Sequence, residues 1–304
     1  ELLMRINQAT TFWPPVGYLL TQPLYALLGV SSDVTSFTTT LWFALAIVGV
    51  YLIGRRLYDW RTGLLAAFIF SFYPAIYLQS RTYYVDMALT ALVLITLICL
   101  LRTEDFSRRR ASLLFGLALG VAALTKNAFI IMTIGPLLVV VARALLANGR
   151  AAWRQLLAWQ PGSRLAPAGH DLAQRLLNMA LAGLIAALLA APWYISHLGI
   201  LAFNAGEVTR DVHLAAKPVT WYLLKFDEGL LIWPYILLLV GLAVGLLRWR
   251  QRGNWFTLLW LASGVAIITM VTRQNVRYLL PVLPAAALLS AAWIVGLRRR
   301  GLAA

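Results

Sequence analysis

Residues 83–101 read YYVDMALTALVLITLICLL, and Asp86 is the only charged residue in this stretch. A helix needs about 20 predominantly apolar residues to cross the hydrocarbon core of a bilayer. The stretch therefore predicts a transmembrane helix with one carboxylate near its first turn. We predict spans at about residues 36–54, 63–80, 83–101, 111–125, 128–146, 177–196, 229–247, 255–272 and 278–297. This pattern indicates an all-α, polytopic membrane protein with about nine spans.

The composition excludes most other classes of protein. Of the 304 residues, 61% are hydrophobic and 12% are charged, whereas soluble domains average about 25% charged residues. The single cysteine, Cys99, permits no disulfide within the chain. A formal net charge of +15 would by itself favour a nucleic-acid partner, but the cations form short clusters between apolar runs, as in membrane proteins. We therefore exclude a soluble enzyme, a disordered chain and a disulfide-rich module, and expect membrane lipids but no nucleic acid as partners.

The charged residues also predict the orientation in the membrane. One set of loops holds 18 arginines and no lysine, and by the positive-inside rule these loops lie in the cytoplasm. They contain Arg55, Arg56, Arg61, Arg102, Arg108, Arg109, Arg110, Arg143, Arg150, Arg154, Arg164, Arg175, Arg248, Arg250, Arg252, Arg298, Arg299 and Arg300. The other set holds all three lysines and seven of the eleven acidic residues. We therefore expect a polar site on the outer face.

We predict a single domain over residues 1–304. Three stretches of the chain are not predicted to cross the membrane. Residues 12–30 are apolar but short, and Pro23 interrupts them, which predicts a helix lying in the outer interface. Residues 147–176 contain several glycines and prolines and predict a cytoplasmic loop. Residues 197–228 are polar and predict an external loop.

Two polar positions lie at the outer ends of predicted spans, where charges persist mainly when they serve a site or reach water. Asp86 follows Arg81 by five residues, so it either forms an intramembrane ion pair with Arg81 or faces an outward cavity. Lys126 lies between two spans with almost no loop. Its ammonium either snorkels to the interface or binds an anionic headgroup.

Two further clusters flank this outer face. Trp13 precedes Pro14 and Pro15 and either anchors the interface or lines a cavity. Arg273, Arg277 and Tyr278 stand at the start of the last span, and arginines bind phosphate oxygens in a bidentate manner. Pro281 and Pro284 follow and would reshape that span.

The segment predicted as an external loop contains candidate ligands for a divalent cation. Glu207, Asp211 and His213 have spacings that could hold a metal with oxygen and imidazole ligands, although a solvated loop is the simpler interpretation. The sequence contains no P-loop, C-x-x-C, H-E-x-x-H or G-x-S-x-G motif.

The order of these motifs carries a family resemblance over about residues 12–297. The motifs are the proline pair at 14–15, GRRLY at 54–58, S-R-x-x-x-x-D at 80–86, GLALGVAALTK at 116–126, APWY at 191–194 and RYLLPVLP at 277–284. Together they resemble the PMT-like branch of the GT-C membrane glycosyltransferases, which holds protein O-mannosyltransferases and the aminoarabinose transferases that modify lipid A. The resemblance implies a GT-C-like helix bundle.

The same resemblance implies an enzyme that transfers a hexosyl or pentosyl group, with inversion, from a polyprenyl-phosphate donor to an acceptor hydroxyl. The acceptor would be a lipid, a glycan or a protein. The site would face the periplasm or exterior from a prokaryotic inner or plasma membrane.

The resemblance also implies roles for individual residues. Lys126 would contact the donor phosphate, and Arg277, Tyr278 and Arg273 would contact phosphate or sugar. Asp86 would line the active cavity. Pro14 and Pro15 match the pair beside that cavity, and we expect Arg81 to line it as well. Trp13 departs from the Lys or His that family members often have before the proline pair, and we expect it to line the cavity and stack on a sugar.

One departure from the family concerns the catalytic acid, which the resemblance implies in a first external loop upstream of the proline pair. Here that region offers only Glu1. We therefore expect an N-terminally truncated sequence. In a complete one, Asp86 would have to act as the base, or the protein would be inactive as a transferase.

Two other functions compete with the transferase. A transporter or flippase would show inverted repeats and broken helices at mid-membrane, and the sequence shows no internal repeat. A scaffolding subunit would not need Asp86, Lys126 and Arg277 on one face.

Overall fold

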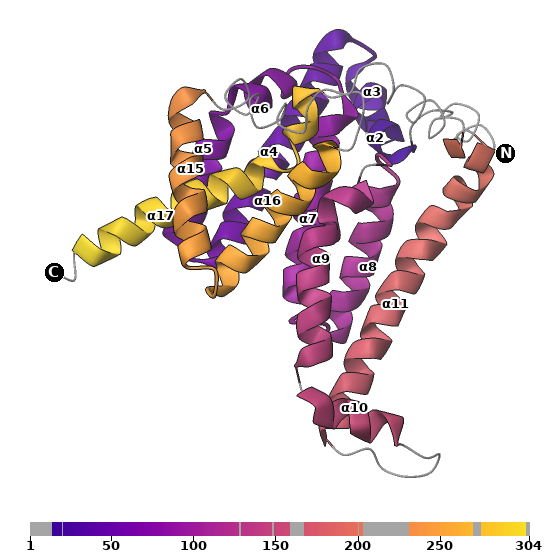
Figure 1. Cartoon of the computed structure of the whole chain (residues 1–304). Helices are drawn as coiled ribbons and strands as arrows, with labels where there is room; N and C mark the ends of the chain where they lie inside the picture. The colour runs from indigo at the N-terminus through magenta and orange to yellow at the C-terminus, as the bar shows by residue number, and fades with distance from the viewer. Residues whose placement is uncertain are drawn as a thin grey trace.

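The computed structural model describes residues 14–19, 21–127, 129–147, 149–158, 167–199, 201–202, 231–269 and 275–301, and these residues form a helical bundle without strands (Figure 1). The helices are α2 (Val16–Leu19), α3 (Gln22–Leu28), α4 (Ser32–Leu57), α5 (Trp60–Ser71), α6 (Pro74–Gln79), α7 (Val85–Arg102), α8 (Arg109–Ala123), α9 (Phe129–Leu146), α10 (Gly149–Leu157), α11 (Pro167–Ser196), α15 (Ile232–Leu247), α16 (Arg252–Thr269), the 3₁₀ helix η1 (Val276–Leu279) and α17 (Leu283–Gly301). The all-α fold class is confirmed.

The chain is a membrane protein, and each predicted span overlaps a helix of the structure. Among the described helices, α4, α7 and α11 are long and apolar enough to cross a bilayer individually. The pair α9 and α10, bent by 72°, adds a fourth if it forms one span. The count of nine spans therefore stays a prediction.

Prolines move two of the predicted boundaries. The unbroken span at 63–80 is wrong, because the chain leaves the helical conformation at Tyr73 (ψ 124°) and divides into α5 and α6. Pro74 disfavours a helical conformation in the residue before it and starts the next helix. The span at 278–297 begins later than predicted, because Pro281 lies in a turn and Pro284 in the first turn of α17.

The stretches predicted not to span differ in detail as well. The interfacial segment at 12–30 contains two short helices, α2 and α3, which meet at Thr21. The predicted loop at 147–176 contains α10 and the first residues of α11, so it is largely helical where the structure describes it. The external segment at 197–228 lies mostly outside the described residues.

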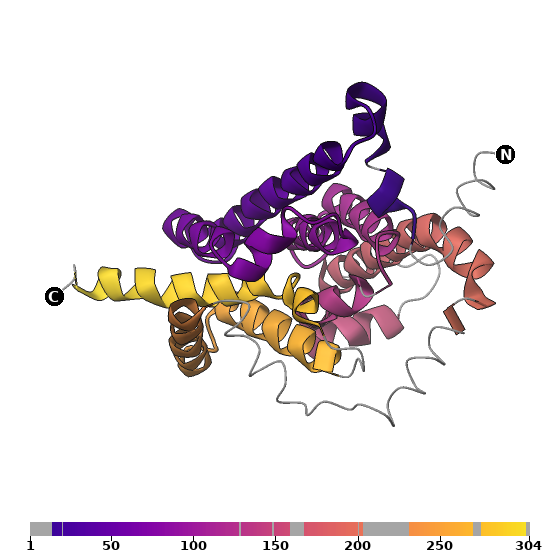
Figure 2. The same ribbon diagram turned by 90° about the horizontal axis from the view of Figure 1, so that it is seen from above.

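Helix α7 is the centre of the fold. It packs against α4 on one side and α8 and α9 on the other, and α8 in turn packs against α11 (Figures 1 and 2). Most side chains of α7 are buried, from Met87 to Leu100. An apolar helix buried on nearly all sides fits an inner position in a membrane bundle. A second row continues from α9 through α16 and α17 to α15.

Ion pairs fasten the bundle at its arginine-rich end, which carries Arg56, Arg143 and Arg248. Glu104 and Asp105 lie in the turn between α7 and α8. Glu104 pairs with Arg56 at 3.1 Å and Asp105 with Arg143 at 2.9 Å. Three successive residues of this turn, Glu104, Asp105 and Phe106, have positive φ angles of 49°, 57° and 62°. The acidic turn therefore ties α4 and α9 to α7.

Close helix contacts depend on glycine, and Gly116 gives a sharp test. A Cβ atom at Gly116 would lie 2.8 Å from Ala182 Cα on α11 and closer still to the Ala182 carbonyl oxygen. Gly116→Ala should therefore force α8 and α11 apart, at a cost of about 1–3 kcal/mol. We expect the melting temperature in detergent to fall by about 2–10 °C.

The matched control is Gly183→Ala on α11, because a Cβ at Gly183 meets no atom within 4 Å. Alanine favours a helix over glycine by up to about 1 kcal/mol, so this variant should be as stable as the parent or more stable. Equal melting temperatures for the two variants would contradict the close packing of α8 on α11.

Candidate functional site

A buried ion pair forms the centre of the candidate site. Asp86 lies in the first turn of α7, where the helix dipole favours a carboxylate. Lys126 lies in the short turn between α8 and α9, and its Nζ donates to Asp86 Oδ1 at 2.6 Å. Asp86 is 2% exposed and Lys126 is 5% exposed. Two opposite charges 40 residues apart in sequence are thus removed from solvent together.

A second cation reaches the same carboxylate from the C-terminal part of the chain. Arg277 lies in η1, and the Asn275 side chain accepts a hydrogen bond from the Arg277 backbone N–H at 3.1 Å. Its Nε is 4.0 Å from Asp86 Oδ2. At this distance Arg277 and Asp86 form an ion pair, but the two atoms are too far apart for a hydrogen bond. Asp86 therefore lies between two cations.

Aromatic rings hold both cations in place. Lys126 Nζ lies 4.8 Å from the centroid of the Tyr278 ring. The Arg277 guanidinium carbon lies 4.8 Å from the Tyr84 ring and 5.5 Å from the Tyr278 ring. Contacts of this kind favour a cation by about 0.5–2 kcal/mol, depending on desolvation. The rings therefore fix the positions of the cations without neutralising them.

Sequence reasoning missed Tyr84. A tyrosine at the end of a span is typical of an interface belt, so its type carried no specific signal. Its position two residues before Asp86 was the available clue.

Two peripheral elements hold the turn that carries Lys126. The Val16 backbone N–H of α2 donates to the Leu124 carbonyl at 2.9 Å. The Tyr194 hydroxyl of α11 donates to the Ala123 carbonyl at 2.9 Å. The turn is therefore fixed from both sides.

The predicted proline pair sits beside this turn. Pro14 and Pro15 are both buried and lead directly into α2. Thr21, at the end of that segment, shares a hydrogen bond of 2.9 Å with the Tyr83 hydroxyl. The proline pair thus starts the short helix that covers the start of α7.

Several buried polar atoms around Lys126 have no hydrogen-bond partner among the described residues. They are Arg277 Nε, and Thr125 Oγ1 and Asn127 Oδ1 on the two residues that flank Lys126. Buried polar groups in native proteins are nearly always satisfied by protein or water. Donors and acceptors gathered around a buried charge are the arrangement expected of a site that binds a polar ligand.

Arg81 takes a different place from the ion pair considered for it. Asp86 pairs with Lys126, whereas the exposed Arg81 guanidinium lies 4.6 Å from the Tyr77 ring. The burial of Lys126 also differs from simple snorkelling, since its ammonium ends on a carboxylate rather than in water.

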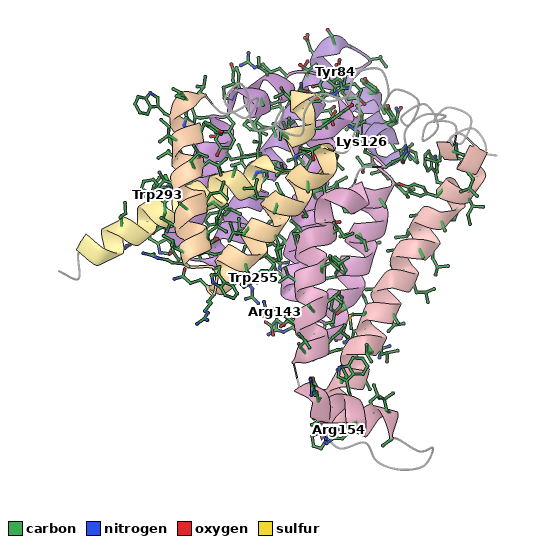
Figure 3. The ribbon with its side chains drawn as sticks, viewed as in Figure 1. Tyr84, Lys126, Arg143, Arg154, Trp255 and Trp293 are labelled. Carbon is green, nitrogen blue, oxygen red and sulfur yellow. The ribbon has the colours of Figure 1, made fainter. Side chains whose placement is uncertain are left out.

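Figure 3 shows that Tyr84 and Lys126 lie near one end of the molecule, whereas Arg143 and Arg154 lie toward the other. Five predicted site residues lie outside the described part of the chain: Trp13, Arg273, Glu207, Asp211 and His213. Among the residues that are described, no three His, Cys, Asp or Glu side chains group to hold a metal. The divalent cation therefore stays a prediction.

Comparison with known proteins identifies the family. The sequence model described as dolichyl-phosphate-mannose-protein mannosyltransferase matches residues 13–166, which is half of the chain. The undecaprenyl phosphate-alpha-4-amino-4-deoxy-L-arabinose arabinosyl transferase 1 of Pseudomonas fluorescens is 27% identical over 296 residues. That alignment covers 91% of this chain and 48% of the relative, so the chain spans about half the length of the curated relative it matches.

Solved structures share the fold. The crystal structure of ArnT from Cupriavidus metallidurans bound to undecaprenyl phosphate matches with a TM-score of 0.68 at 18% identity, covering 97% of this chain and 53% of that one. The archaeal oligosaccharyltransferase AglB from Archaeoglobus fulgidus, in complex with an inhibitory peptide and a dolichol-phosphate, matches with a TM-score of 0.61 at 14% identity. That match covers 96% of this chain and 43% of AglB. The fold is therefore that of the GT-C membrane glycosyltransferases.

The buried pair predicts a non-additive pattern of stabilities. Removing one partner leaves an uncompensated buried charge, which costs about 3–5 kcal/mol. We expect Asp86→Asn and Lys126→Met each to lower the melting temperature by about 5–15 °C. The double variant should recover much of this loss, because it buries no unpaired charge at either position. Additive losses in the double-mutant cycle would show that the two groups do not interact.

Proposed function

The chain belongs to the dolichyl-phosphate-mannose-protein mannosyltransferase family, and on this premise we propose that it transfers a sugar from a polyprenyl-phosphate donor to an acceptor hydroxyl. The observation that carries the proposal is the buried Asp86–Lys126 pair, with the unsatisfied Nε of Arg277 beside it. The structural relatives ArnT and AglB bind undecaprenyl phosphate and a dolichol-phosphate, respectively. Both are lipids whose headgroup is a phosphate.

The charge of the site suits such a donor. Asp86, Lys126 and Arg277 together carry a formal charge of +1. The phosphodiester that links a sugar to a polyprenyl chain carries one negative charge. Binding the donor therefore neutralises the site, and the phosphate oxygens supply the acceptors that the Arg277 Nε lacks.

The proposed reaction breaks the bond between the anomeric carbon and the phosphate oxygen. The acceptor hydroxyl attacks this carbon from the opposite side, which inverts its configuration, and its proton passes to a carboxylate acting as general base. The bonding electrons leave with the phosphate oxygen. Lys126 and Arg277 stabilise the negative charge that develops there. The rings of Tyr84 and Tyr278 hold those cations in position through cation–π contacts.

Asp86 serves this reaction by positioning the cations. A general base must come within hydrogen-bond reach of the proton that it removes. The Oδ1 of Asp86 is occupied by Lys126, and the residue is 2% exposed. We therefore assign it the role of holding Lys126 and Arg277 around the phosphate, and assign proton removal to a different carboxylate.

The proposal includes the location of the reaction. The site lies at the end of the bundle opposite Arg143 and Arg154 (Figure 3). By the positive-inside rule this end faces the periplasm or exterior from a prokaryotic inner or plasma membrane. The acceptor is a lipid, a glycan or a protein that presents a hydroxyl on that side.

Lys126→Ala tests the phosphate contact. Loss of a charge-assisted hydrogen bond costs about 1.5–3 kcal/mol, so we expect the KM for the polyprenyl-phosphate donor to rise about 10- to 100-fold. The KM for the acceptor should change little. Steady-state kinetics in nanodiscs measure both constants. The control is Arg154→Ala, which removes one exposed charge from α10; an equal rise in both Michaelis constants, or the same result for the control, would contradict the assignment.

Asp86→Asn separates a positioning residue from a base. We expect a lower rate at every pH, because the amide no longer holds the cations, while the acidic limb of the pH–rate profile keeps its midpoint. Loss of that limb would identify Asp86 as the base instead. Unchanged transfer at all pH values would leave Asp86 without a role in the reaction.

A further inference from the structure

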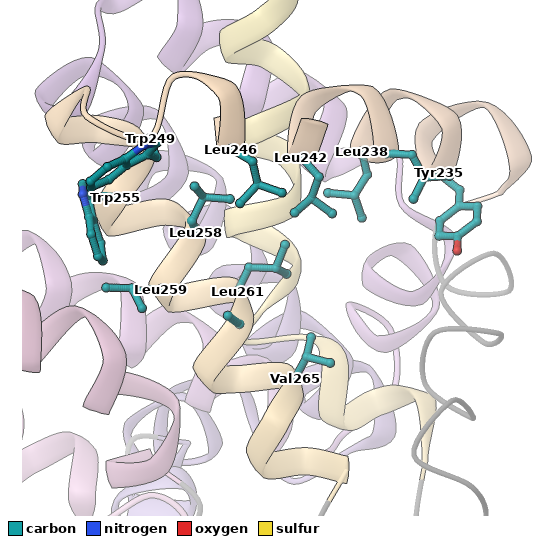
Figure 4. A pocket seen from close by; sticks show the side chains of 12 residues that line it. Tyr235, Leu238, Leu242, Leu246, Trp249, Trp255, Leu258, Leu259, Leu261 and Val265 are labelled. Atoms are coloured by element: carbon teal, nitrogen blue, oxygen red, sulfur yellow. The ribbon is translucent and has the colours of Figure 1, made fainter. Parts of the chain in front are cut away.

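An apolar groove lies between α15 and α16, away from the Lys126 site. It has a volume of about 520 Å³. Its lining is almost wholly hydrocarbon and runs from Tyr235 at one end to Trp249 and Trp255 at the other (Figure 4). Leu242 and Leu258 are among the residues between these ends. The Trp249 and Trp255 rings meet edge to face at 5.6 Å. Tryptophan at the end of an apolar surface is typical of the headgroup level of a bilayer.

The tryptophan end of the groove is strongly cationic. The turn between α15 and α16 reads RWRQR at residues 248–252, and the sequence contains no acidic residue after Glu228. The Arg250 guanidinium lies 5.5 Å from the Trp249 ring, so it is held at the mouth of the groove. The Asn254 side chain donates to the Arg248 carbonyl at 3.0 Å, which fixes the turn. A small recess of about 40 Å³, lined in part by Arg248, Gln251 and Asn254, lies beside the same turn.

These arginines differ from those at the neighbouring turn between α7 and α8. There, Arg56, Arg108 and Arg143 each form an ion pair with Glu104 or Asp105. Within the described residues, Arg248 and Arg250 have no acidic partner. Arg250 contacts a ring that lines the groove, and Arg248 lines the small recess on the α17 side of the same turn. Two arginines without counter-charge at the turn that closes an apolar groove are complementary to a molecule with an anionic head and a hydrocarbon tail.

We propose that this groove is a binding site for an anionic phospholipid of the cytoplasmic leaflet. The headgroup phosphate lies against Arg248 and Arg250, and one acyl chain lies in the groove between α15 and α16. Trp249 and Trp255 mark the boundary between the two parts of the lipid. This site is independent of the proposed transfer reaction, because it lies at the arginine-rich end and shares no residue with the Lys126 site.

The dimensions of the groove fit one chain. Tyr235 and Leu246, both in the lining, are 11 residues apart on α15, which corresponds to about 16 Å along a helix, and Trp249 follows in the turn. One leaflet contributes about half of a hydrocarbon core that is about 30 Å thick. The groove is therefore long enough to hold an acyl chain over the whole depth of its leaflet. The acyl chain passes from one apolar environment to another, so the arginines supply the selectivity.

The test measures lipid binding to the purified protein by native mass spectrometry, with dioleoyl phosphatidylglycerol and dioleoyl phosphatidylcholine as probes. We expect one saturable phosphatidylglycerol site with an affinity at least about tenfold higher than that for phosphatidylcholine. The double change Arg248→Gln and Arg250→Gln should abolish this preference, since each cation near an anionic headgroup contributes about fivefold in affinity. Binding of phosphatidylcholine should be unchanged.

The matched control is Arg109→Gln with Arg110→Gln, which removes two exposed arginines at the start of α8 on the same side. It should keep the preference for phosphatidylglycerol. An equal loss in both double variants would overturn the proposal, because the preference would then reflect net charge alone. Displacement of phosphatidylglycerol by undecaprenyl phosphate would also overturn it, because the groove would then hold a polyprenyl tail.

Substitutions that fill the groove test whether an acyl chain binds between α15 and α16. Ala262→Trp and Leu239→Trp each place a large ring at an exposed position of the lining. We expect either variant to lose the saturable site for both lipids while melting within a few degrees of the parent. Parental binding in a variant with a parental melting temperature would exclude the groove as the site. Should one variant fail to fold, the other, on the facing helix, gives the same readout.

Discussion

The pairing of Asp86 with Lys126 is the interaction on which the arrangement of the site depends. Removing two ions from water costs several kcal/mol each, and only close geometry with additional favourable contacts offsets that cost. Here the contact is 2.6 Å, the carboxylate lies at a helix N-terminus, and a tyrosine ring faces the ammonium. These requirements fix the start of α7 against the turn between α8 and α9. Because α2 and α11 then bind the backbone of that turn, the pair determines where four elements meet.

Much of this site could be predicted from sequence, because charges are rare in apolar segments. Asp86 and Lys126 each interrupt an apolar environment, Arg277 stands at the start of the last predicted span, and the alternation of spans places all three on one face. Their partners could not be predicted. Arg81 is near Asp86 in sequence, yet the bundle brings Lys126 to it from 40 residues away, and η1 brings Arg277 from the C-terminal part of the chain. Pairing across helices depends on which helices are neighbours, and hydropathy carries no information on that.

The same reasoning explains the errors in the helices. Hydropathy does not register a kink, so residues 63–80 read as one span although Pro74 ends the helical conformation at Tyr73. From composition alone, all arginine-rich turns are predicted to be cytoplasmic loops, with no difference between them. The structure separates two kinds of turn. Arg56 and Arg143 pair with an acidic turn, whereas Arg248 and Arg250 lie at the turn that closes an apolar groove and have no acidic partner among the described residues. A rule that counts charges by side of the membrane cannot make this distinction, because it depends on the nearest counter-ion.

A buried carboxylate between two cations also bears on release of the lipid product. In the proposed reaction a singly charged phosphodiester enters a site of net charge +1, and the leaving phosphate monoester carries a charge of about −1.5 to −2 at neutral pH. The product is therefore attracted more strongly by Lys126 and Arg277 than the donor is, which would slow turnover if those cations stood alone. Asp86 opposes this effect, because it repels the additional negative charge and competes for Lys126. The carboxylate that assembles the site thus also limits its affinity for the spent lipid, so one group serves both the stability of the fold and the completion of the cycle.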